Sequence, residues 1–554
     1  MASEPASKSK DDLRMRKQQS PLASQRSKDP QNASAPSSLF PLGYKEGFNQ
    51  WWTGISAAAA EHKVLSMIPY LQQAPTHKQT GTTADSPNGS TDSLQKADHS
   101  QAGEETINSV NDPYGPRRWR SSMVELNGKH RALNEFSVER IGEEAEQNLV
   151  ILHGYGAGLG FFYKNFEPLS RVKGWQLYAL DMLGMGRSTR PSFKIKSKNR
   201  QTAIEEAEDW FIDALEEWRQ KRKIDRFTLL GHSLGGYMAT AYALKYPGRL
   251  NKLVLVSPVG IPEDPYAISA DMPEAGDSAL ANEFSQDQST IASAEGDEDM
   301  QKITPKGDSN NFLNARSKDS ADSAGVPRRR PVPKWLTYLW DANISPFTLV
   351  RWSGPLGPRL VSGWTHRRFS HLPAAEAQAL HDYSYSIFRL RGSGEYALAY
   401  ILAPGAFARS PLIRRIHHVG RQLLPPSSDS ATGVSTPASA ATRSTVSISA
   451  SENPSVISSP EREKGIPIVF MYGDNDWMDI SGGYAAKAKI EEETRRILRD
   501  TTAPEERAAD NGSAKVITIQ NAGHHLYLDG WEEFNQAILD EMADVTRRDR
   551  RRKG

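Results

Sequence analysis

Apolar and polar positions alternate along this chain in two different periods. Short apolar or alternating runs of strand length recur in two regions and are separated by stretches whose apolar residues fall on one helical face, most clearly in residues 202–220. Strands and helices that alternate in this way predict an α/β fold with a mostly parallel central sheet flanked by helices. The predicted strands are 121–126, 134–141, 148–152, 176–181, 227–230, 253–257, 466–472 and 515–520.

Polar, low-complexity stretches interrupt these regions, and such stretches cannot bury enough apolar surface to fold. An aromatic, helix-capable segment with Trp51 and Trp52 precedes the core and favours either contact with a membrane interface or packing on the core. The predicted organisation is a disordered N-terminus 1–38, a Trp-bearing helical segment 39–72, a linker 73–113, the first half of the core 114–265, a disordered insertion 266–334, a cap 335–412, a Ser/Pro-rich linker 413–464, the second half of the core 465–546 and a basic tail 547–554.

Composition narrows the classes of function. The 68 Lys and Arg residues balance 67 Asp and Glu residues, so charge predicts no nucleic-acid partner. The chain has no cysteine, which removes disulfides, thiolate metal sites and cysteine nucleophiles and favours a reducing compartment. We find no run of about 18 apolar residues and no secretory leader, and we therefore expect an intracellular protein that does not span a bilayer. Two basic clusters, 328–330 and 547–553, favour either a solvated surface or contact with anionic lipid.

The sequence FTLLGHSLGGYMATAYALKY, residues 227–246, predicts a buried strand, a tight turn and a helix rich in small residues. Gly231 and Gly235 flank Ser233 at the spacing of a nucleophile elbow, where larger residues would collide with the neighbouring backbone. The first helical amides would then face an oxyanion. We predict that Ser233 is a nucleophile; the alternative is a glycine-rich loop with a surface serine.

A general base is expected on a loop after a late strand. The alternating run 515–520 leads into Asn521 and Ala522, followed by Gly523, His524 and His525. An α/β-hydrolase carries its catalytic histidine at such a place. We predict His524 as the base, because small residues before it let the imidazole reach inward, and keep His525 as the competitor.

The third member of a triad would be a carboxylate that orients the histidine. The apolar run 466–472 opens into a loop that holds Asp474, Asp476 and Asp479. Asp476 has the expected placement after the strand, and we predict it as the acid with Asp479 as the alternative. The other two aspartates would then be a turn residue and a helix cap.

An oxyanion hole requires backbone amides near the nucleophile. The loop 153–160, HGYGAGLG, follows an early apolar strand and is rich in glycine, which predicts donors at the amides of Tyr155 and Leu234. The rival interpretation is a dinucleotide-binding loop. The serine, acid and histidine loops follow in α/β-hydrolase order, which a dinucleotide-binding fold would not require.

Several strings along the chain form a recognisable set: 150–166, LDMLGMGRS at 180–188, the elbow at 231–235, GSGE at 392–395, PGAFAR at 404–409 and 521–529. Together they resemble one lipid family of α/β-hydrolases. The family includes fungal cardiolipin-specific deacylases, lysophosphatidic acid acyltransferases of plants and fungi, animal N-acyl phospholipid lipases and the animal lipid-droplet co-activator of triglyceride lipase, and it is classed near the prolyl aminopeptidase-like hydrolases. The long insertions of this chain depart from the family's pattern.

The resemblance implies a serine hydrolase that deacylates a membrane glycerophospholipid, with cardiolipin at the inner mitochondrial membrane as the leading substrate. It implies lipid and a peripheral membrane surface as partners and requires no metal or other cofactor. Lipid droplets and cytoplasm are alternative locations.

The alternatives in function are acyl transfer from acyl-CoA to lysophosphatidic acid and a non-catalytic lipase co-activator. In the co-activator the elbow residue is asparagine, so serine favours an enzyme. A peptidase is disfavoured because the cap is rich in arginine.

The family's acyltransferase signature, H-x-x-x-x-D, matches His524 and Asp529. His524 is already needed as the base, and Asp529 has the spacing of a cap for the last helix. We therefore predict that Asp529 is a helix cap. An acyl-enzyme can be captured by water or by an alcohol, so this signature does not separate hydrolysis from acyl transfer.

Overall fold

A computed structural model describes residues 40–71, 73–75, 105–263, 345–403, 407–424 and 461–553 of the chain. The predictions for 1–38 and 266–334 lie outside the described residues. The same holds for 76–104 and 425–460, which contain most of the two predicted linkers, and for the first ten residues of the predicted cap.

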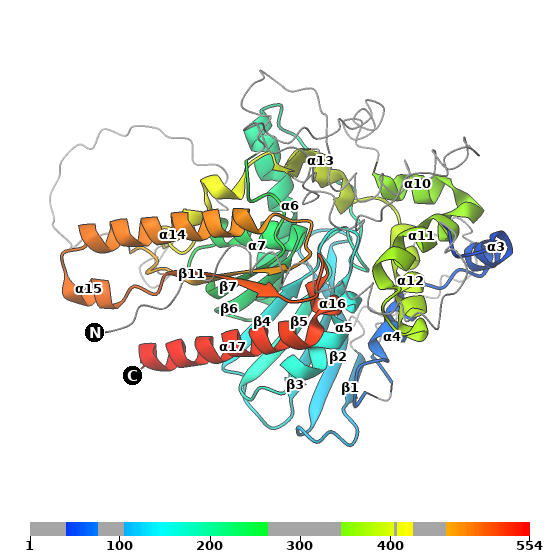
Figure 1. Ribbon diagram of the computed structural model, residues 1–554, viewed down its shortest axis with the longest axis horizontal. Helices are drawn as coiled ribbons and strands as arrows, with labels where there is room; N and C mark the ends of the chain where they lie inside the picture. The colour runs from blue at the N-terminus through cyan, green and yellow to red at the C-terminus, as the bar shows by residue number, and fades with distance from the viewer. Residues whose placement is uncertain are drawn as a thin grey trace, which may run out of the picture.

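One large sheet forms the centre of the described structure (Figure 1). Its order is β1-β2-β3-β5-β4-β6-β7-β10-β11, antiparallel up to the β3–β5 pair and parallel from β5 to β11. The strands are β1 (Glu105–Asn108), β2 (Arg117–Glu125), β3 (Ala132–Arg140), β4 (Gln147–Leu152), β5 (Trp175–Leu180), β6 (Phe227–His232), β7 (Leu250–Val256), β10 (Pro467–Gly473) and β11 (Ser513–Ile519).

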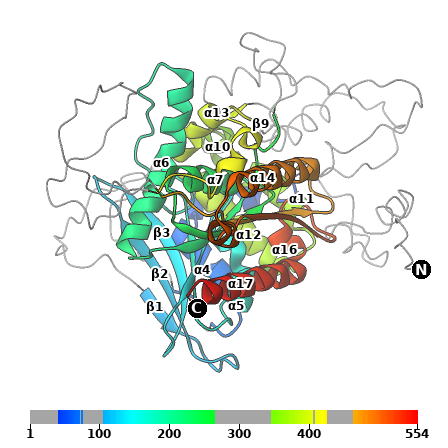
Figure 2. The same ribbon diagram turned by 90° about the vertical axis from the view of Figure 1, so that its left-hand side faces the viewer.

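Helices cover both faces of this sheet, so its central strands are buried on each side (Figures 1 and 2). β10 is buried along its whole length, which explains why it reads as a continuous apolar run. One core contains side chains of α6, α7 and α14, and the other contains side chains of α4, α5 and α17. The bounds are α4 (Ala57–Leu65), α5 (Tyr163–Leu169), α6 (Arg200–Lys221), α7 (Leu234–Lys245), α14 (Ile480–Asp500), α15 (Pro504–Ala508), α16 (Leu526–Asp529) and α17 (Trp531–Lys553).

The cap is inserted between β7 and β10. Ser345 caps its first described helix, whose first residue, Pro346, has no amide that needs an acceptor. The cap elements are α10 (Pro346–Trp352), η4 (Gly354–Leu356), α11 (Gly357–Phe369), α12 (Ala374–Phe388), η5 (Gly394–Ala397), α13 (Leu398–Ile401), β8 (Leu402–Ala403), β9 (Phe407–Ala408), η6 (Leu412–Arg414) and η7 (Ile416–His418). A further turn, η2 (Leu159–Phe162), precedes α5.

The Trp-bearing segment folds into two helices, α3 (Tyr44–Thr53) and α4, separated at Gly54. α4 joins the core to the cap through Glu61, which is buried. Its carboxylate accepts hydrogen bonds from Arg187, from Asn134 Nδ2 at 3.1 Å and from the Tyr383 hydroxyl of α12 at 3.2 Å. A charge desolvated in this way needs such partners, so α4 is an integral part of the fold.

The structure confirms the α/β-hydrolase fold class and corrects several boundaries. β1 lies in the range predicted as linker and extends the sheet by antiparallel pairing with β2. The predicted basic tail is the last part of α17, because its residues continue a helix whose earlier turns pack on α5. Residues 412–418, at the start of the second predicted linker, form short 3-10 turns.

Candidate active site

Ser233 stands at the turn between β6 and α7. Its backbone has φ 52° and ψ −114°, a left-handed conformation that is rare for a residue with a side chain. A Cβ atom on Gly231 would lie 2.3 Å from Gly235 O, and one on Gly235 would lie 2.7 Å from the carbonyl oxygens of Leu152 and His153. Only glycine fits these two positions, so the sequence spacing and the tight turn have the same steric cause.

The loops after β10 and β11 bring Asp476 and His524 together. His524 Nδ1 lies 3.2 Å from Asp476 Oδ1, and both side chains are buried. A carboxylate oxygen accepts, so Nδ1 carries the proton and Nε2 is left as an acceptor. The His524 ring centroid lies 4.8 Å from that of His232, the residue before Ser233. The base and acid candidates therefore adjoin the serine elbow.

The three aspartates after β10 have different contacts. Asp474 Oδ1 accepts the amide of Ala522 at 2.9 Å and so braces the histidine loop. Asp479 is the N-cap of α14, and its Oδ1 accepts the amide of Ser481 at 2.9 Å. Of the three, it is Asp476 whose side chain contacts the ring of His524. This division of contacts favours Asp476 over Asp479 as the acid.

Three neighbours of this pair were missed by sequence reasoning. The Ser257 hydroxyl donates to Asp476 Oδ2, and the amide of Met478 donates to Asp476 Oδ1 at 3.0 Å. The ring of Trp477 lies 4.7 Å from that of His524. Ser257 follows β7, which pairs with β10, so a polar residue directly after the apolar run 253–256 was the available signal.

His525 does not occupy the same position as His524. Its ring stacks on Phe161 at 6.5 Å and faces Phe369 at the same distance. Burial lowers the pKa of His525 well below its usual value, and the positive charge of nearby Arg368 lowers it further. A neutral ring packed among aromatic side chains is an ordinary core histidine.

The glycine-rich loop after β4 runs beside the elbow. A Cβ atom on Gly154 would lie 3.0 Å from Ser233 Cβ, so the loop that carries Tyr155 is in contact with the nucleophile candidate. Leu234 is the first residue of α7, and amides of a first helical turn have no acceptor within the helix. Both predicted oxyanion donors thus lie on segments that adjoin Ser233.

His153 fixes the start of this loop. Its Nε2 accepts the amide of Met182 at 3.1 Å, and its Nδ1 donates to Gly154 O at 2.7 Å. Burial lowers the pKa of His153 to about 4. The ring is therefore neutral, and its 3.7 Å approach to Asp181 is not an ion pair.

Cap side chains cover the oxyanion loop. The ring of Tyr155 lies 4.9 Å from that of Phe347 in α10, which stacks on Phe388 of α12 at 4.5 Å. Ser233 is 4% exposed. Ser233 is therefore buried beneath its neighbours in this structure.

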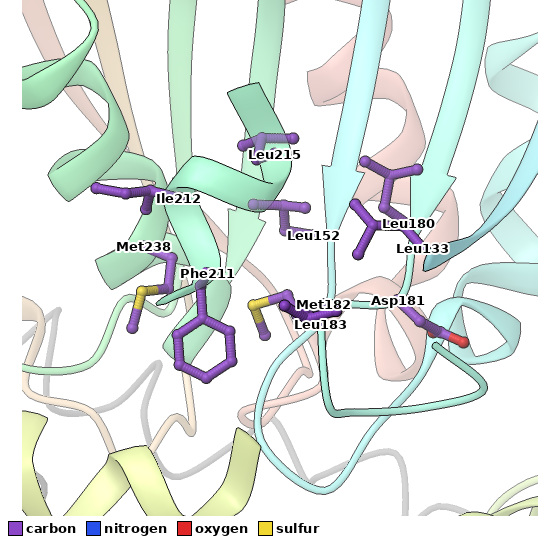
Figure 3. A pocket seen from close by; sticks show the side chains of 10 residues that line it. All are labelled: Leu133, Leu152, Leu180, Asp181, Met182, Leu183, Phe211, Ile212, Leu215 and Met238. Carbon is purple, nitrogen blue, oxygen red and sulfur yellow. The ribbon is translucent and has the colours of Figure 1, made fainter. Parts of the chain in front are cut away.

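A separate apolar pocket lies between the sheet and helices α6 and α7 (Figure 3). The carboxylate of Asp181 is turned away from its apolar side chains and accepts amides of Leu159 and Arg187 at 2.7 and 2.8 Å. No predicted site residue lines this pocket, so it is distinct from the candidate reaction site. Its lining is Leu133, Leu152, Leu180, Asp181, Met182, Leu183, Phe211, Ile212, Leu215 and Met238.

The arginines of the cap already have protein contacts. Arg351 pairs with Glu395 at 2.6 Å, Arg359 stacks on Tyr44 at 3.7 Å and Arg368 lies over Trp364 at 4.5 Å. Burial lowers the pKa of Arg368 to about 9. These contacts hold the guanidinium groups in place within the cap.

Asp529 does not have the role predicted for it. It ends α16, and its Oδ2 accepts the amide of Gly523 at 3.0 Å, in the histidine loop rather than in α17. Its Oδ1 lies 3.3 Å from Nε2 of His371 in the cap. Burial, with the charge of Asp476 as a further cause, raises the pKa of Asp529 to about 7.

Within the described ranges, no group of three or more His, Asp and Glu side chains could hold a metal ion. In the same residues, no helix combines the length and apolar character needed to cross a bilayer.

The sheet order and the succession of serine elbow, acid loop and histidine loop define an α/β-hydrolase. Residues 147–530 match the family model described as alpha/beta hydrolase fold, and the chain belongs to this family. It is 30% identical over 403 residues to a 1-acylglycerol-3-phosphate O-acyltransferase of Arabidopsis thaliana, a match that covers 72% of this chain and 66% of that protein. The chain thus spans slightly less than two thirds of that relative.

Two animal proteins that act on lipids by name are also similar to this chain. The chain is 32% identical over 397 residues to the 1-acylglycerol-3-phosphate O-acyltransferase ABHD5 of Rattus norvegicus, which covers 71% of this chain and 76% of that protein. It is 26% identical over 401 residues to a (lyso)-N-acylphosphatidylethanolamine lipase of Bos taurus, with coverage of 72% and 79%. These similarities confirm the resemblance to the lipid group of α/β-hydrolases.

Proposed function

We propose that this protein is a serine hydrolase that deacylates membrane glycerophospholipids, with cardiolipin as the leading substrate. The observation that carries the proposal is the 3.2 Å contact between His524 Nδ1 and Asp476 beside the elbow of Ser233. A serine, a histidine and a buried carboxylate in this relation are the parts of an acyl-transfer triad. Relatives named as lipid acyltransferases and a lipid lipase support a lipid ester as substrate.

In the proposed reaction Ser233 Oγ attacks the ester carbonyl while His524 Nε2 accepts the hydroxyl proton. Asp476 orients the imidazole and stabilises its charged form. The amides of Tyr155 and Leu234 hold the oxyanion. Collapse of the tetrahedral adduct breaks the ester bond, and the proton passes from His524 to the leaving lysolipid hydroxyl. Water then attacks the acyl-enzyme while His524 Nε2 accepts one of its protons. Collapse of this second adduct breaks the bond between the acyl group and Ser233 Oγ, His524 gives the proton to Ser233 Oγ, and a fatty acid is released.

An exposed aromatic patch supports the proposal of a peripheral membrane surface as partner. α3 lies against η4, and the exposed apolar side chains of this end gather there. Aromatic side chains with polar edges suit the headgroup region of a bilayer. The patch consists of Tyr44, Phe48, Trp51, Trp52, Ile55, Trp352 and Leu356. Figure 1 places α3 and the C-terminal end of α17 at opposite ends of the long axis, so the basic end is a separate surface.

Acyl transfer to lysophosphatidic acid is the second candidate, and it is favoured by the relatives named 1-acylglycerol-3-phosphate O-acyltransferase. The same acyl-enzyme serves both reactions, with acyl-CoA as donor and the lysolipid hydroxyl in place of water. A lipid-binding co-activator is the third. For location we propose the inner mitochondrial membrane, with lipid droplets or cytoplasm as the alternatives.

The test is lipid analysis after incubation of purified protein with cardiolipin liposomes, with and without lysophosphatidic acid plus acyl-CoA. The variants are Ser233→Ala and, as a matched control, Ser66→Ala, which removes an exposed hydroxyl at the end of α4. Loss of one cardiolipin acyl chain in wild type and Ser66→Ala but not in Ser233→Ala is the expected result. New phosphatidic acid would instead establish acyl transfer, and no change that depends on Ser233 would favour the co-activator.

A further inference from the structure

The His524 backbone is held from both sides. On one side the amide of Gly523 donates to Asp529 Oδ2 at 3.0 Å, and on the other His232 Nε2 donates to His524 O at 3.0 Å. Asp476 contacts the ring itself. Asp529 thus acts on the backbone of the loop that carries the histidine.

The second oxygen of Asp529 faces the cap. His371 lies between α11 and α12, and its Nε2 is 3.3 Å from Asp529 Oδ1. Both side chains are largely buried, with 7% of His371 and 16% of Asp529 exposed. One carboxylate therefore bridges the cap and the histidine loop, although these two segments are more than 150 positions apart in the sequence.

We propose that Asp529 is a positioning residue that latches the histidine loop to the cap, with His371 as its cap-side partner. The inference rests on the proposed catalytic role of His524. It assigns the H-x-x-x-x-D motif of this chain to loop placement, because one oxygen accepts the backbone amide before His524 and the other meets the cap.

The latch predicts that the hydrogen-bond acceptor matters more than the negative charge. Asn at position 529 keeps an acceptor for the amide of Gly523, whereas Ala leaves that amide without its side-chain partner. A displacement of the imidazole by about 1 Å costs on the order of 100-fold in rate. The variants are therefore Asp529→Ala, Asp529→Asn, His371→Ala and the double variant Asp529→Ala/His371→Ala. Asp540→Asn on the exposed face of α17 is the control.

The first readout is the rate at which a fluorophosphonate labels Ser233, because this step needs the serine and histidine but no particular lipid. The second is kcat and KM for a short-chain ester, and the third is the thermal unfolding midpoint. We expect Asp529→Ala to lower labelling and kcat about 10- to 100-fold with little change in KM. Asp529→Asn should recover most of the rate, and the double variant should be no slower than Asp529→Ala.

Three outcomes would overturn the latch. Equal slowing in Asp529→Asn and Asp529→Ala would mean that the charge acts on the imidazole. Effects of His371→Ala and Asp529→Ala that multiply in the double variant would mean that the cap contact is independent. Labelling of all variants at the wild-type rate would mean that Asp529 does not position His524. Failure of the proposed function has a different signature, since wild-type protein would then show no labelling that Ser233→Ala abolishes. If Asp529→Ala does not fold, the labelling rates and kcat of Asp529→Asn and His371→Ala are compared with those of wild type instead.

Discussion

The imidazole of His232 donates from Nε2 to the carbonyl oxygen of His524 across 3.0 Å. The carbonyl can only accept, so Nε2 carries the proton. Burial, with the nearby His524 as a further cause, lowers the pKa of His232 well below its usual value and keeps the ring neutral. The residue before the proposed nucleophile therefore fixes the backbone of the proposed base, and two of the three loops of the proposed triad are joined directly.

Removal of this donor should slow the reaction without loss of the triad. In His232→Ala the carbonyl of His524 loses its partner, and we expect kcat to fall about 10- to 100-fold because the imidazole is less well placed. Labelling of Ser233 by a fluorophosphonate measures the effect. His366→Ala, at an exposed position of α11, is the control. A wild-type rate in His232→Ala would show that the hydrogen bond has no positioning role.

The two aspartates left open by the sequence should behave differently. Asp476→Asn should lower kcat about 10⁴-fold, because the amide would favour the wrong imidazole tautomer. Asp479→Ala should leave kcat almost unchanged and cost about 1 kcal/mol of stability, because it removes only the N-cap of α14. Steady-state kinetics and urea unfolding of both variants check this. A large loss of kcat in Asp479→Ala with a normal rate in Asp476→Asn would reverse the assignment.

Steric demand at the elbow can be tested at Gly235. A Cβ atom there would lie 2.7 Å from two backbone oxygens, which cannot move aside as a flexible side chain could. We expect Gly235→Ala to lower the free energy of unfolding by more than about 2 kcal/mol, which urea unfolding would measure.

Gly482 in α14 is the matched control for this substitution. A Cβ atom on Gly482 meets its nearest neighbours at 3.5 Å, which is ordinary contact, and alanine is the better helix former. Gly482→Ala should therefore leave stability unchanged or raise it slightly. Equal stability of both variants would mean that the elbow has more room than these distances allow.

The N-terminal helix α4 should be required for folding. Glu61→Ala leaves the buried guanidinium of Arg187 without this carboxylate, and breaking a buried ion pair costs about 3–5 kcal/mol. Thermal unfolding measures the loss, with the exposed Glu205→Ala of α6 as the control. A loss no larger than that of the control would mean that α4 docks through its apolar residues alone.

Sequence patterns were sufficient for the features that depend on local spacing. Gly231, Ser233 and Gly235 predict the elbow because the pattern itself spans only five residues, although the requirement at Gly235 comes from backbone oxygens of strand β4 and the loop that follows it. The contacts of Ser257 and His232 could not be read in the same way, because they depend on which loops the sheet brings side by side. Ser257 meets Asp476 only because β7 and β10 are neighbours.

The error at Asp529 has the same origin. Its position before the last helix matched a capping pattern, but a hydrogen bond to Gly523 and a cap contact at His371 compete for the same carboxylate. These contacts with residues distant in sequence outweighed the local preference of an aspartate for capping the next helix. The strand β1 was missed because its four residues follow a long polar stretch and gain their stability from pairing with β2.

Asp529 should also make stability depend on pH. Its folded pKa is about 7, against 3.8 as the ordinary value, because burial and Asp476 disfavour the charge more than Arg368, His524 and the amide of Gly523 favour it. Between these two values the folded state binds more protons than the unfolded state. The stability contributed by this group is complete below about pH 4 and is lost as the pH rises through about 7.

Asp529→Asn removes this titration. As the pH rises from 5 to 8, wild type should therefore lose unfolding free energy relative to the variant. The change is about 3 kcal/mol, because within this window the folded state alone keeps the proton over about two pH units, from 5 to 7, and one pKa unit corresponds to about 1.4 kcal/mol. Urea unfolding at both pH values measures it, and Asp540→Asn controls for the removal of an exposed carboxylate. If the difference is the same at both pH values, Asp529 has an ordinary pKa and its carboxylate is ionised throughout this range.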